Sequence, residues 1–160
     1  MPKLTVKETL FTSCEEAFRI VHDYSRRLEW DTLLQTAYLE DGEAADVGIT
    51  AVCKGKTALL GIEMRTIYVS FQPGRVAAVK LTNRAPFFDS FAASIRHIRL
   101  DGGRSELIYE LNFKAKPAFL RPFLHPIMGT MLKWETQKRL GSLKRYVEEN
   151  RIVVSNESSI

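Results

Sequence analysis

The side chains best suited to acid–base chemistry are few and lie far apart in the sequence. The chain has three histidines, His22, His97 and His125. His97 stands at even spacing from Phe91 and Ile95, so on a strand it would face the same side and could act as a general base beside an apolar cavity. A half-exposed strand histidine is the alternative. We expect His22 and His125 to be structural or exposed.

Two other side chains could take part in chemistry. Tyr109 lies on an alternating strand pattern and, with His97, is a candidate for moving protons. Asp31 follows Trp30 and could orient a substrate, although a capping or turn role is the simpler interpretation. No glycine-rich phosphate loop and no G-x-S-x-G elbow is present, so no catalytic residue is assigned by motif.

Metal and disulfide chemistry are not indicated. Three scattered histidines do not form a ligand cluster, and Cys14 and Cys53 have no C-x-x-C spacing. We therefore expect reduced thiols, no metal and no cofactor.

Composition is that of one globular domain, which we place at residues 1–152, followed by a flexible polar tail over 153–160. The 160 residues are 45% hydrophobic and 26% charged, and the net charge is +4. The basic residues are scattered among acids, which indicates a solvated surface and no nucleic-acid partner. No apolar run is long enough to span a membrane and no secretory pattern opens the chain, so we expect a cytoplasmic protein.

The N-terminal part predicts strand, helix, helix, strand. Residues 4–11 alternate and are rich in β-formers, and Ser13 with Glu16 forms a capping-box pattern that opens a helix over 14–24. A second short turn is expected over 25–31, and the next strand over 34–40.

The middle of the chain predicts a meander of antiparallel strands over 47–54, 62–72, 75–82, 87–100 and 105–115, joined by turn signals such as Pro73-Gly74 and Asp101-Gly102-Gly103. Ile67, Val69 and Phe71 blur the alternation of the second of these strands, which suggests a bulge.

The last third predicts one long amphipathic helix that ends near Asn150. Its apolar residues recur at three- and four-residue steps, with Thr136 filling a gap in the stripe. The stripe consists of Leu124, Met128, Met131, Leu132, Leu140, Leu143 and Val147, and is widened in its first half by Phe123, Ile127 and Trp134. Pro126 would remove a backbone hydrogen bond, so we expect a kink or a restart, with a separate short helix before Gly129.

These features together resemble a known superfamily. They are the order of elements, the stretch Thr12 to Phe18, Trp30, the Asp101 to Arg104 turn and the closing LGSLKRYVE of 140–148. The chain resembles the START-like (SRPBCC) helix-grip superfamily, and it looks most like the polyketide cyclase/dehydrase and coenzyme Q-binding lipid-transfer branch. The resemblance implies an α+β, Bet v 1-like fold, in which a curved antiparallel sheet of six to seven strands wraps around a long C-terminal helix. It also implies an apolar cavity between sheet and helix.

We expect that cavity to be lined by the inward side chains of the strands and of the long helix. The residues predicted to line it are Tyr38, Met64, Thr66, Tyr68, Phe91, Ile95, Tyr109, Leu111, Phe113, Phe123, Ile127, Met128, Met131 and Trp134. The mixture of aromatic residues with a few polar groups is typical of a ligand site, whereas a plain core is the alternative. Access would be gated by residues 82–86 and 117–126.

Three functions follow from this interpretation. The first is binding or transport of a hydrophobic small molecule such as a lipid, a quinone or a polyketide-like compound, by a monomer or homodimer that contacts membranes at most transiently. The second is a cyclase or dehydratase that uses His97 or a tyrosine, which would need polar groups converging inside the cavity. The third is a protein-interaction module with a filled interior and an exposed apolar patch.

Overall fold

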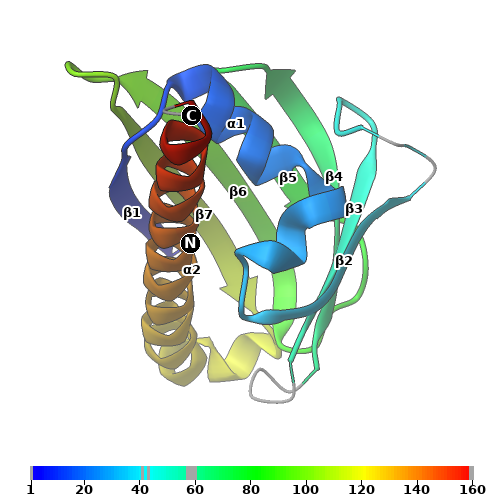
Figure 1. The fold of residues 1–160 in the computed structure, drawn as a ribbon. Helices are drawn as coiled ribbons and strands as arrows, with labels where there is room; N and C mark the ends of the chain where they lie inside the picture. Colours follow the sequence, from blue (N-terminus) through cyan, green and yellow to red (C-terminus); the bar gives the residue numbers. More distant parts are fainter. Residues whose placement is uncertain (1, 41, 43, 57–60, 159–160) are drawn as a thin grey trace.

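A single antiparallel sheet of seven strands dominates this computed structural model, which describes residues 2–40, 42, 44–56 and 61–158, with side chains described up to residue 150. The spatial order of the strands is β1-β7-β6-β5-β4-β3-β2. Their bounds are β1 Lys3–Leu10, β2 Leu34–Glu40, β3 Thr50–Gly55, β4 Glu63–Gln72, β5 Val76–Leu81, β6 Phe88–Arg99 and β7 Ser105–Ala115. The sheet curves, and its helices cover one face (Figure 1).

The short helices follow β1 as predicted. Helix α1 (Cys14–His22) begins at Ser13, whose side chain accepts a hydrogen bond from the Glu16 backbone N–H at 3.1 Å. The 3-10 helix η1 (Tyr24–Glu29) follows and lies next to β2 (Figure 1).

The strand pattern read from the sequence agrees with the sheet. In β7, Leu107, Leu111 and Phe113 are buried on the helix-facing side, as the alternation predicted. The pairing of β4 with β5 shifts register between Tyr68 and Ser70, which places the expected irregularity at Val69. The predicted helix-grip α+β fold is therefore confirmed.

Two expectations for the C-terminal helix were wrong. Helix α2 (Arg121–Ser158) runs without interruption through Pro126, so no separate helix precedes Gly129. Pro126 lies within the first two turns and removes one backbone hydrogen bond, and the rest of the ladder carries the helix across it. The helix also continues past Asn150 to Ser158, because no glycine or proline follows to end it.

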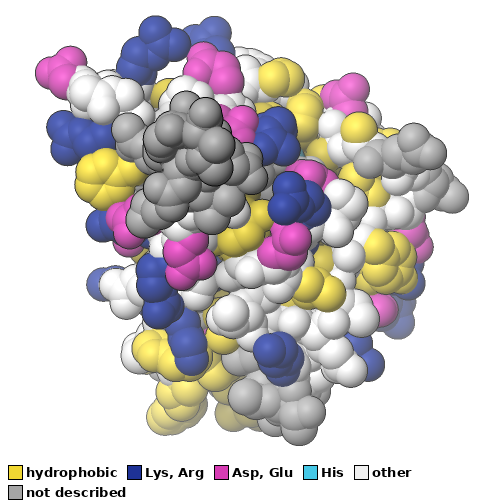
Figure 2. Space-filling model, in the orientation of Figure 1, with side chains coloured by type: hydrophobic (Ala, Val, Ile, Leu, Met, Phe, Trp, Pro, Cys, Tyr) yellow, Lys and Arg dark blue, Asp and Glu magenta, His cyan; other side chains and the backbone are white. Residues whose placement is uncertain are grey.

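Two packing regions divide the length of α2. The second half packs in a buried cluster with β1, α1 and β7, made up of Val6, Leu10, Ala17, Val21, Trp30, Leu107, Leu140, Leu143 and Val147. The first half contributes Met128 to a different cluster with Phe88, Leu111 and Phe113. Its outward side remains apolar, and hydrophobic side chains gather over the start of α2 at the lower end of the molecule (Figure 2). No described helix is long and apolar enough to cross a membrane.

Candidate functional site

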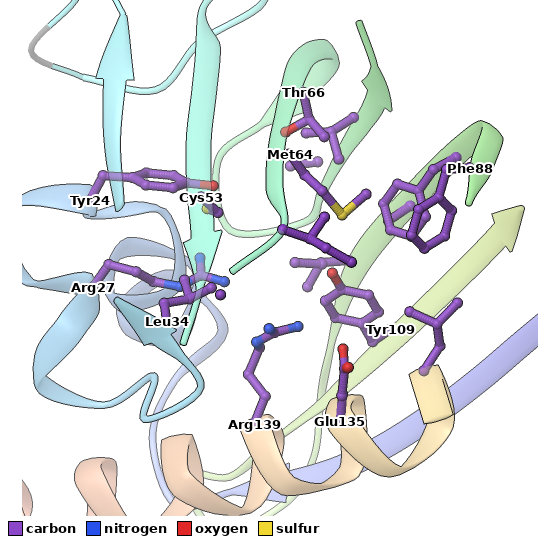
Figure 3. Close-up of a pocket in the computed structure, with 18 of the residues that line it drawn as sticks. Tyr24, Arg27, Leu34, Cys53, Met64, Thr66, Phe88, Tyr109, Glu135 and Arg139 are labelled. Atoms are coloured by element: carbon purple, nitrogen blue, oxygen red, sulfur yellow. The ribbon is translucent and has the colours of Figure 1, made fainter. Parts of the chain in front are cut away.

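A cavity of about 230 Å³ lies between the curved sheet and the first half of α2. Most of its wall is apolar, and the charged side chains lie at one end (Figure 3). The lining residues are His22, Tyr24, Arg27, Leu34, Cys53, Gly55, Ile62, Met64, Thr66, Tyr68, Ala77, Val79, Phe87, Phe88, Phe91, Ala93, Ile95, Tyr109, Met128, Met131, Leu132, Glu135 and Arg139. In Figure 3 the sheet supplies Met64, Thr66 and Phe88, and α2 supplies Glu135 and Arg139.

The structure divides the predicted lining residues into three groups. Those in the cavity wall are Met64, Thr66, Tyr68, Phe91, Ile95, Tyr109, Met128 and Met131. Leu111 and Phe113 are buried beside Met128 in the adjoining cluster and do not reach the cavity. Tyr38, Phe123, Ile127 and Trp134 lie outside it, with side chains between 46% and 70% exposed.

Tyr38 points outward because β2 is irregular. Its pairing with β3 shifts register between Leu34 and Thr36. A one-residue shift sends every following side chain to the opposite face, since side chains alternate along a strand. Leu34 therefore lines the cavity, whereas Tyr38 faces away from it.

The orientation of α2 explains why Phe123, Ile127 and Trp134 lie outside the cavity. The cavity-facing row runs through Met128, Leu132, Glu135 and Arg139, spaced by three or four residues. Phe123, Ile127 and Trp134 belong to a neighbouring apolar row that faces solvent, so the wide stripe consists of one buried and one exposed face.

A buried ion triad closes the charged end of the cavity. The Nε atoms of Arg27 and Arg139 both donate to Oδ2 of Asp31, at 3.1 and 2.8 Å. The Asp31 side chain is fully buried, and its other oxygen accepts from the Leu33 backbone N–H at 3.3 Å. Asp31 thus fills the expected turn role and also holds two arginines in place.

The charges of the triad support one another. Burial disfavours the charged forms of Arg27 and Arg139, but the Asp31 carboxylate outweighs it, so the pKa values of both arginines are raised. Burial likewise opposes ionisation of Asp31, and the two arginines outweigh it, so the pKa of Asp31 is lowered. All three groups are ionised, and the triad carries one net positive charge.

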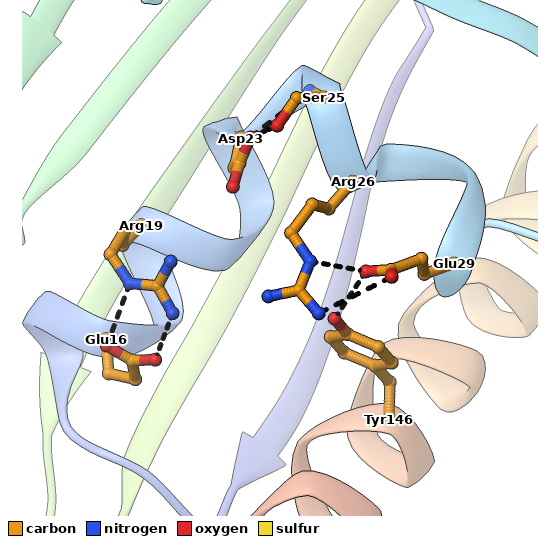
Figure 4. Close-up of polar contacts among 7 residues, drawn as sticks. All are labelled: Glu16, Arg19, Asp23, Ser25, Arg26, Glu29 and Tyr146. Carbon is orange, nitrogen blue, oxygen red and sulfur yellow. Dashed lines mark hydrogen bonds and ion pairs between the residues drawn. The ribbon is translucent and has the colours of Figure 1, made fainter.

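Contacts outside the cavity hold the supporting elements together. Tyr146 of α2 donates its hydroxyl to Glu29 of η1 at 2.8 Å, and Arg26 pairs with the same carboxylate at 2.7 Å (Figure 4). These contacts tie η1, which carries Arg27, to α2, which carries Arg139. Inside, the Arg27 guanidinium lies 4.5 Å from the centre of the buried Trp30 ring.

Glu135 lies one helical turn before Arg139 and also faces the cavity (Figure 3). Among the described residues it forms no ion pair with either arginine. Burial raises the pKa of Glu135, and the nearby Arg139 offsets only part of that rise. A carboxyl group whose burial favours its neutral form therefore lies one helical turn from a cation.

A hydrogen-bonded chain of His22, Tyr68 and Tyr24 forms another part of the wall. Nδ1 of His22 lies 2.7 Å from the Tyr68 hydroxyl, which donates to the Tyr24 hydroxyl at 3.4 Å. Burial, with Arg27 and His97 nearby, lowers the pKa of His22 to about 3, so its ring is neutral. His22 was expected to be structural or exposed, and the structure places it in the cavity wall.

His97 lies on the predicted side of β6 but not in the cavity. Helix α1 covers it, with the Phe18 ring 5.6 Å away, and burial lowers its pKa to about 4. Neither ring nitrogen has a hydrogen-bond partner among the described residues. The other candidate, Tyr109, does line the cavity. His125 accepts a hydrogen bond from the Ala115 backbone N–H at 3.1 Å.

The charged end was missed at the sequence level. The scattered basic residues, which include Arg27 and Arg139, predict a solvated surface, and no sequence pattern singled out Glu135. The available signal was spacing, since Glu135 and Arg139 continue the three- and four-residue steps of Met128 and Leu132. Within the described part of the chain, no group of three or more His, Cys, Asp or Glu side chains could hold a metal ion.

Comparison with known protein families decides the classification. The family model described as "Polyketide cyclase / dehydrase and lipid transport" matches residues 1–148. The chain belongs to this family. A search of curated proteins finds no match.

Solved structures share the fold at low sequence identity. A START superfamily protein from Mycobacterium smegmatis has a TM-score of 0.72 and 14% identity, over 92% of this chain and 97% of that one. The Zhui aromatase/cyclase from Streptomyces sp. R1128 has a TM-score of 0.75 and 14% identity, over 92% and 93%. A norcoclaurine synthase from Thalictrum flavum has a TM-score of 0.70 and 9% identity, over 94% and 96%. These likenesses support the START-like helix-grip fold of the family member described here.

Proposed function

We propose that this family member binds a hydrophobic small molecule in the cavity between the sheet and α2, with the polar group of that molecule at the Arg27–Arg139 end. The observation that carries the proposal is the cavity of about 230 Å³, which has an apolar wall and one charged end. Ligand pockets typically combine an apolar wall with a few polar groups that fix orientation. Lipids, quinones and polyketide-like compounds have this character.

Energetics indicate that the polar end matters for affinity. Burying roughly 300 Å² of apolar ligand surface contributes about 7.5 kcal/mol at about 25 cal/mol per Å². Association itself costs about 4 kcal/mol or more, so apolar burial alone leaves weak binding. Contacts at the charged end would supply the remaining affinity and select the ligand.

Access would lie between the β5–β6 loop and α2. Phe87 and Met131 both line the cavity and are 48% and 46% exposed, so they stand where the cavity meets solvent. The Phe87 carbonyl accepts from the Lys116 backbone N–H at 3.0 Å, which joins the loop to the segment before α2. This arrangement supports gating by residues 82–86 and 117–126. The carrier would work in the cytoplasm, as a monomer or homodimer.

Filling the cavity tests the proposal. Val79 lines the cavity, whereas Val69 is 49% exposed on the neighbouring strand. We expect Val79→Trp to abolish binding of fluorescent fatty acids or quinones and to remove any molecule that co-purifies, measured by organic extraction and mass spectrometry. Val69→Trp should leave both unchanged. Equal binding by the wild type and Val79→Trp would rule out this cavity as the site.

A second candidate function is proton-transfer catalysis of the cyclase or dehydratase type. Glu135 favours it, because its cavity-facing carboxylate can take the α-proton of a β-hydroxyketone and pass that proton to the leaving hydroxyl, so that the C=C bond forms and water leaves. Tyr109 lines the same cavity and could orient a carbonyl. Glu135→Gln should then abolish turnover of a β-hydroxyketone while leaving its binding intact. Binding without turnover in the wild type would leave the carrier function alone.

A further inference from the structure

Arg139 presents hydrogen-bond donors that no described group of the protein uses. Its Nε donates to Asp31, and among the described residues no other hydrogen bond or ion pair of its guanidinium is found. A guanidinium has five N–H donors in a planar fork, so the four N–H groups of the two terminal nitrogens remain available. In Figure 3 this group points toward the interior of the cavity, next to Glu135.

Burial makes these open donors significant. The Arg139 side chain is only 15% exposed and that of Arg27 only 9%. Two cations share the single Asp31 carboxylate, and Glu135, the acidic side chain described in the cavity wall, forms no ion pair with either of them. A buried polar group without a partner is costly, and a buried charge more so, so an anionic group placed here would be strongly favoured.

We propose that the Arg139 end of the cavity is a carboxylate subsite and that the ligand is an amphipathic acid. The two carboxylate oxygens accept from the two terminal nitrogens of Arg139, the bidentate geometry that a guanidinium favours. The apolar body extends past Tyr109 and Met128 toward Phe87 and the mouth. This subsite rests on the proposed binding function and narrows its ligand class.

A matched pair of ligands tests the subsite at pH 8 by isothermal titration calorimetry. Decanoic acid and 1-decanol have the same chain, and only the acid is ionised. Charge-assisted hydrogen bonds predict that the wild type prefers the acid by about 10- to 100-fold. Arg139→Gln should remove that preference and change 1-decanol affinity by less than about threefold. Lys138→Gln, a change at the exposed neighbour, should alter neither.

Each outcome is informative. If the wild type binds acid and alcohol equally, the carboxylate subsite is refuted and the cavity function stands. If it binds neither, while binding no quinone or other lipid, both fail. If Arg139→Gln does not fold, Arg139→Lys replaces it in the test. Lysine keeps the positive charge but lacks the two terminal guanidinium nitrogens, so we expect this variant to lose part of the preference for the acid. Retention of the full preference in that variant, with no carbon-13 shift of a labelled ligand carboxyl, would overturn the bidentate assignment.

A separate observation concerns the solvent-facing row of α2 and the residues before it, which we call the apolar ridge. It consists of Phe119, Phe123, Ile127, Met131 and Trp134, exposed by 78%, 70%, 63%, 46% and 52%. Such a contiguous apolar face marks a contact surface. Met131 also lines the cavity, so the ridge is continuous with the mouth.

Basic side chains outnumber acidic ones around the ridge. From Lys116 to Trp134 the sequence contains Lys116, Arg121 and Lys133 and no acidic residue. Arg121 is paired with Asp89 at 3.0 Å, and the Lys138 ammonium lies 4.8 Å from the centre of the Trp134 ring. In Figure 2 hydrophobic side chains at the lower end adjoin lysine and arginine side chains. Apolar and aromatic side chains flanked by basic ones suit an anionic lipid surface.

We propose that the apolar ridge docks on an anionic bilayer surface, which brings the cavity mouth to the lipid. Flotation with vesicles of phosphatidylcholine and phosphatidylglycerol tests this. Phe123→Ser/Ile127→Ser should weaken binding about tenfold or more, and salt or pure phosphatidylcholine should weaken wild-type binding. The control is Val47→Ser/Val69→Ser, which removes two exposed valines elsewhere. Unchanged vesicle binding by the ridge variant would refute the proposal. So would sedimentation equilibrium showing that the wild type is a dimer and the ridge variant a monomer, because the ridge would then be a dimer interface.

Discussion

Removing the charge of Asp31 should destabilise the protein strongly. Asp31→Asn keeps the shape of the side chain but removes the negative charge that balances Arg27 and Arg139. The Nε atoms of both arginines donate to the same carboxylate oxygen. Breaking a buried ion pair by removing one partner costs about 3–5 kcal/mol. The single carbonyl oxygen of the introduced amide can take the place of Oδ2 and still accept from an arginine, although the hydrogen bond from the Leu33 backbone is then lost, so we expect the lower end, about 3 kcal/mol.

Urea unfolding followed by circular dichroism measures this loss. Thermal unfolding gives a second readout, because for a chain of this size each kcal/mol lowers Tm by about 2–4 °C, so a fall of roughly 6–12 °C is expected. Asp101→Asn, in an exposed turn, should change the free energy of unfolding by less than about 0.5 kcal/mol.

A double variant separates loss of charge balance from loss of packing. Adding Arg139→Met to Asp31→Asn removes one of the stranded cations and should restore about 1 kcal/mol or more. A cost below about 1 kcal/mol for Asp31→Asn, or no recovery in the double variant, would refute the view that Asp31 balances two buried arginines.

The remaining predictions concern stability. The pKa values of His22 and His97, about 3 and about 4, lie below the unfolded value of 6.5, so the unfolded chain binds more protons and the free energy of unfolding falls as pH drops below 6.5. At pH 5 the loss is about 2 kcal/mol per histidine, and His97→Leu should halve the difference between pH 7.5 and pH 5 in urea unfolding. Ser13→Ala removes the cap of α1 and should cost about 1 kcal/mol, whereas Ser13→Asp should not. Leu143→Ala leaves a cavity in the core, because Leu143 is fully buried, and should lower the free energy of unfolding by about 2–5 kcal/mol. Leu28→Ala, at a 48% exposed site, should be nearly neutral in thermal unfolding.

The fold could be predicted because its signals are local. Alternation in β7 places Leu107 and Leu111 on one buried face, and Ser13 with Glu16 marks the start of α1. These patterns depend only on the period of each element and its caps, which neighbouring residues specify. The bulge at Val69 was also visible, as a break in the alternation.

The site depends on features that local patterns do not specify. The register shift in β2 turns Tyr38 outward, and it arises from pairing with β3. The rotation of α2 decides that Met128 and Arg139 face inward while Phe123 faces solvent, and it is set by packing on the sheet. A wide apolar stripe cannot by itself distinguish a broad buried face from a buried row beside an exposed one.

Methionine methyl signals test the central claim directly. Three of the four methionines, Met64, Met128 and Met131, line the cavity, so carbon-13 methyl labelling places probes in its wall. On titration with decanoic acid we expect all three signals to shift together and to show contacts with the ligand chain. A reporter at the exposed position of Leu28→Met should not move. Saturable binding that leaves Met64 and Met128 unshifted would contradict the assignment of the cavity as the ligand site.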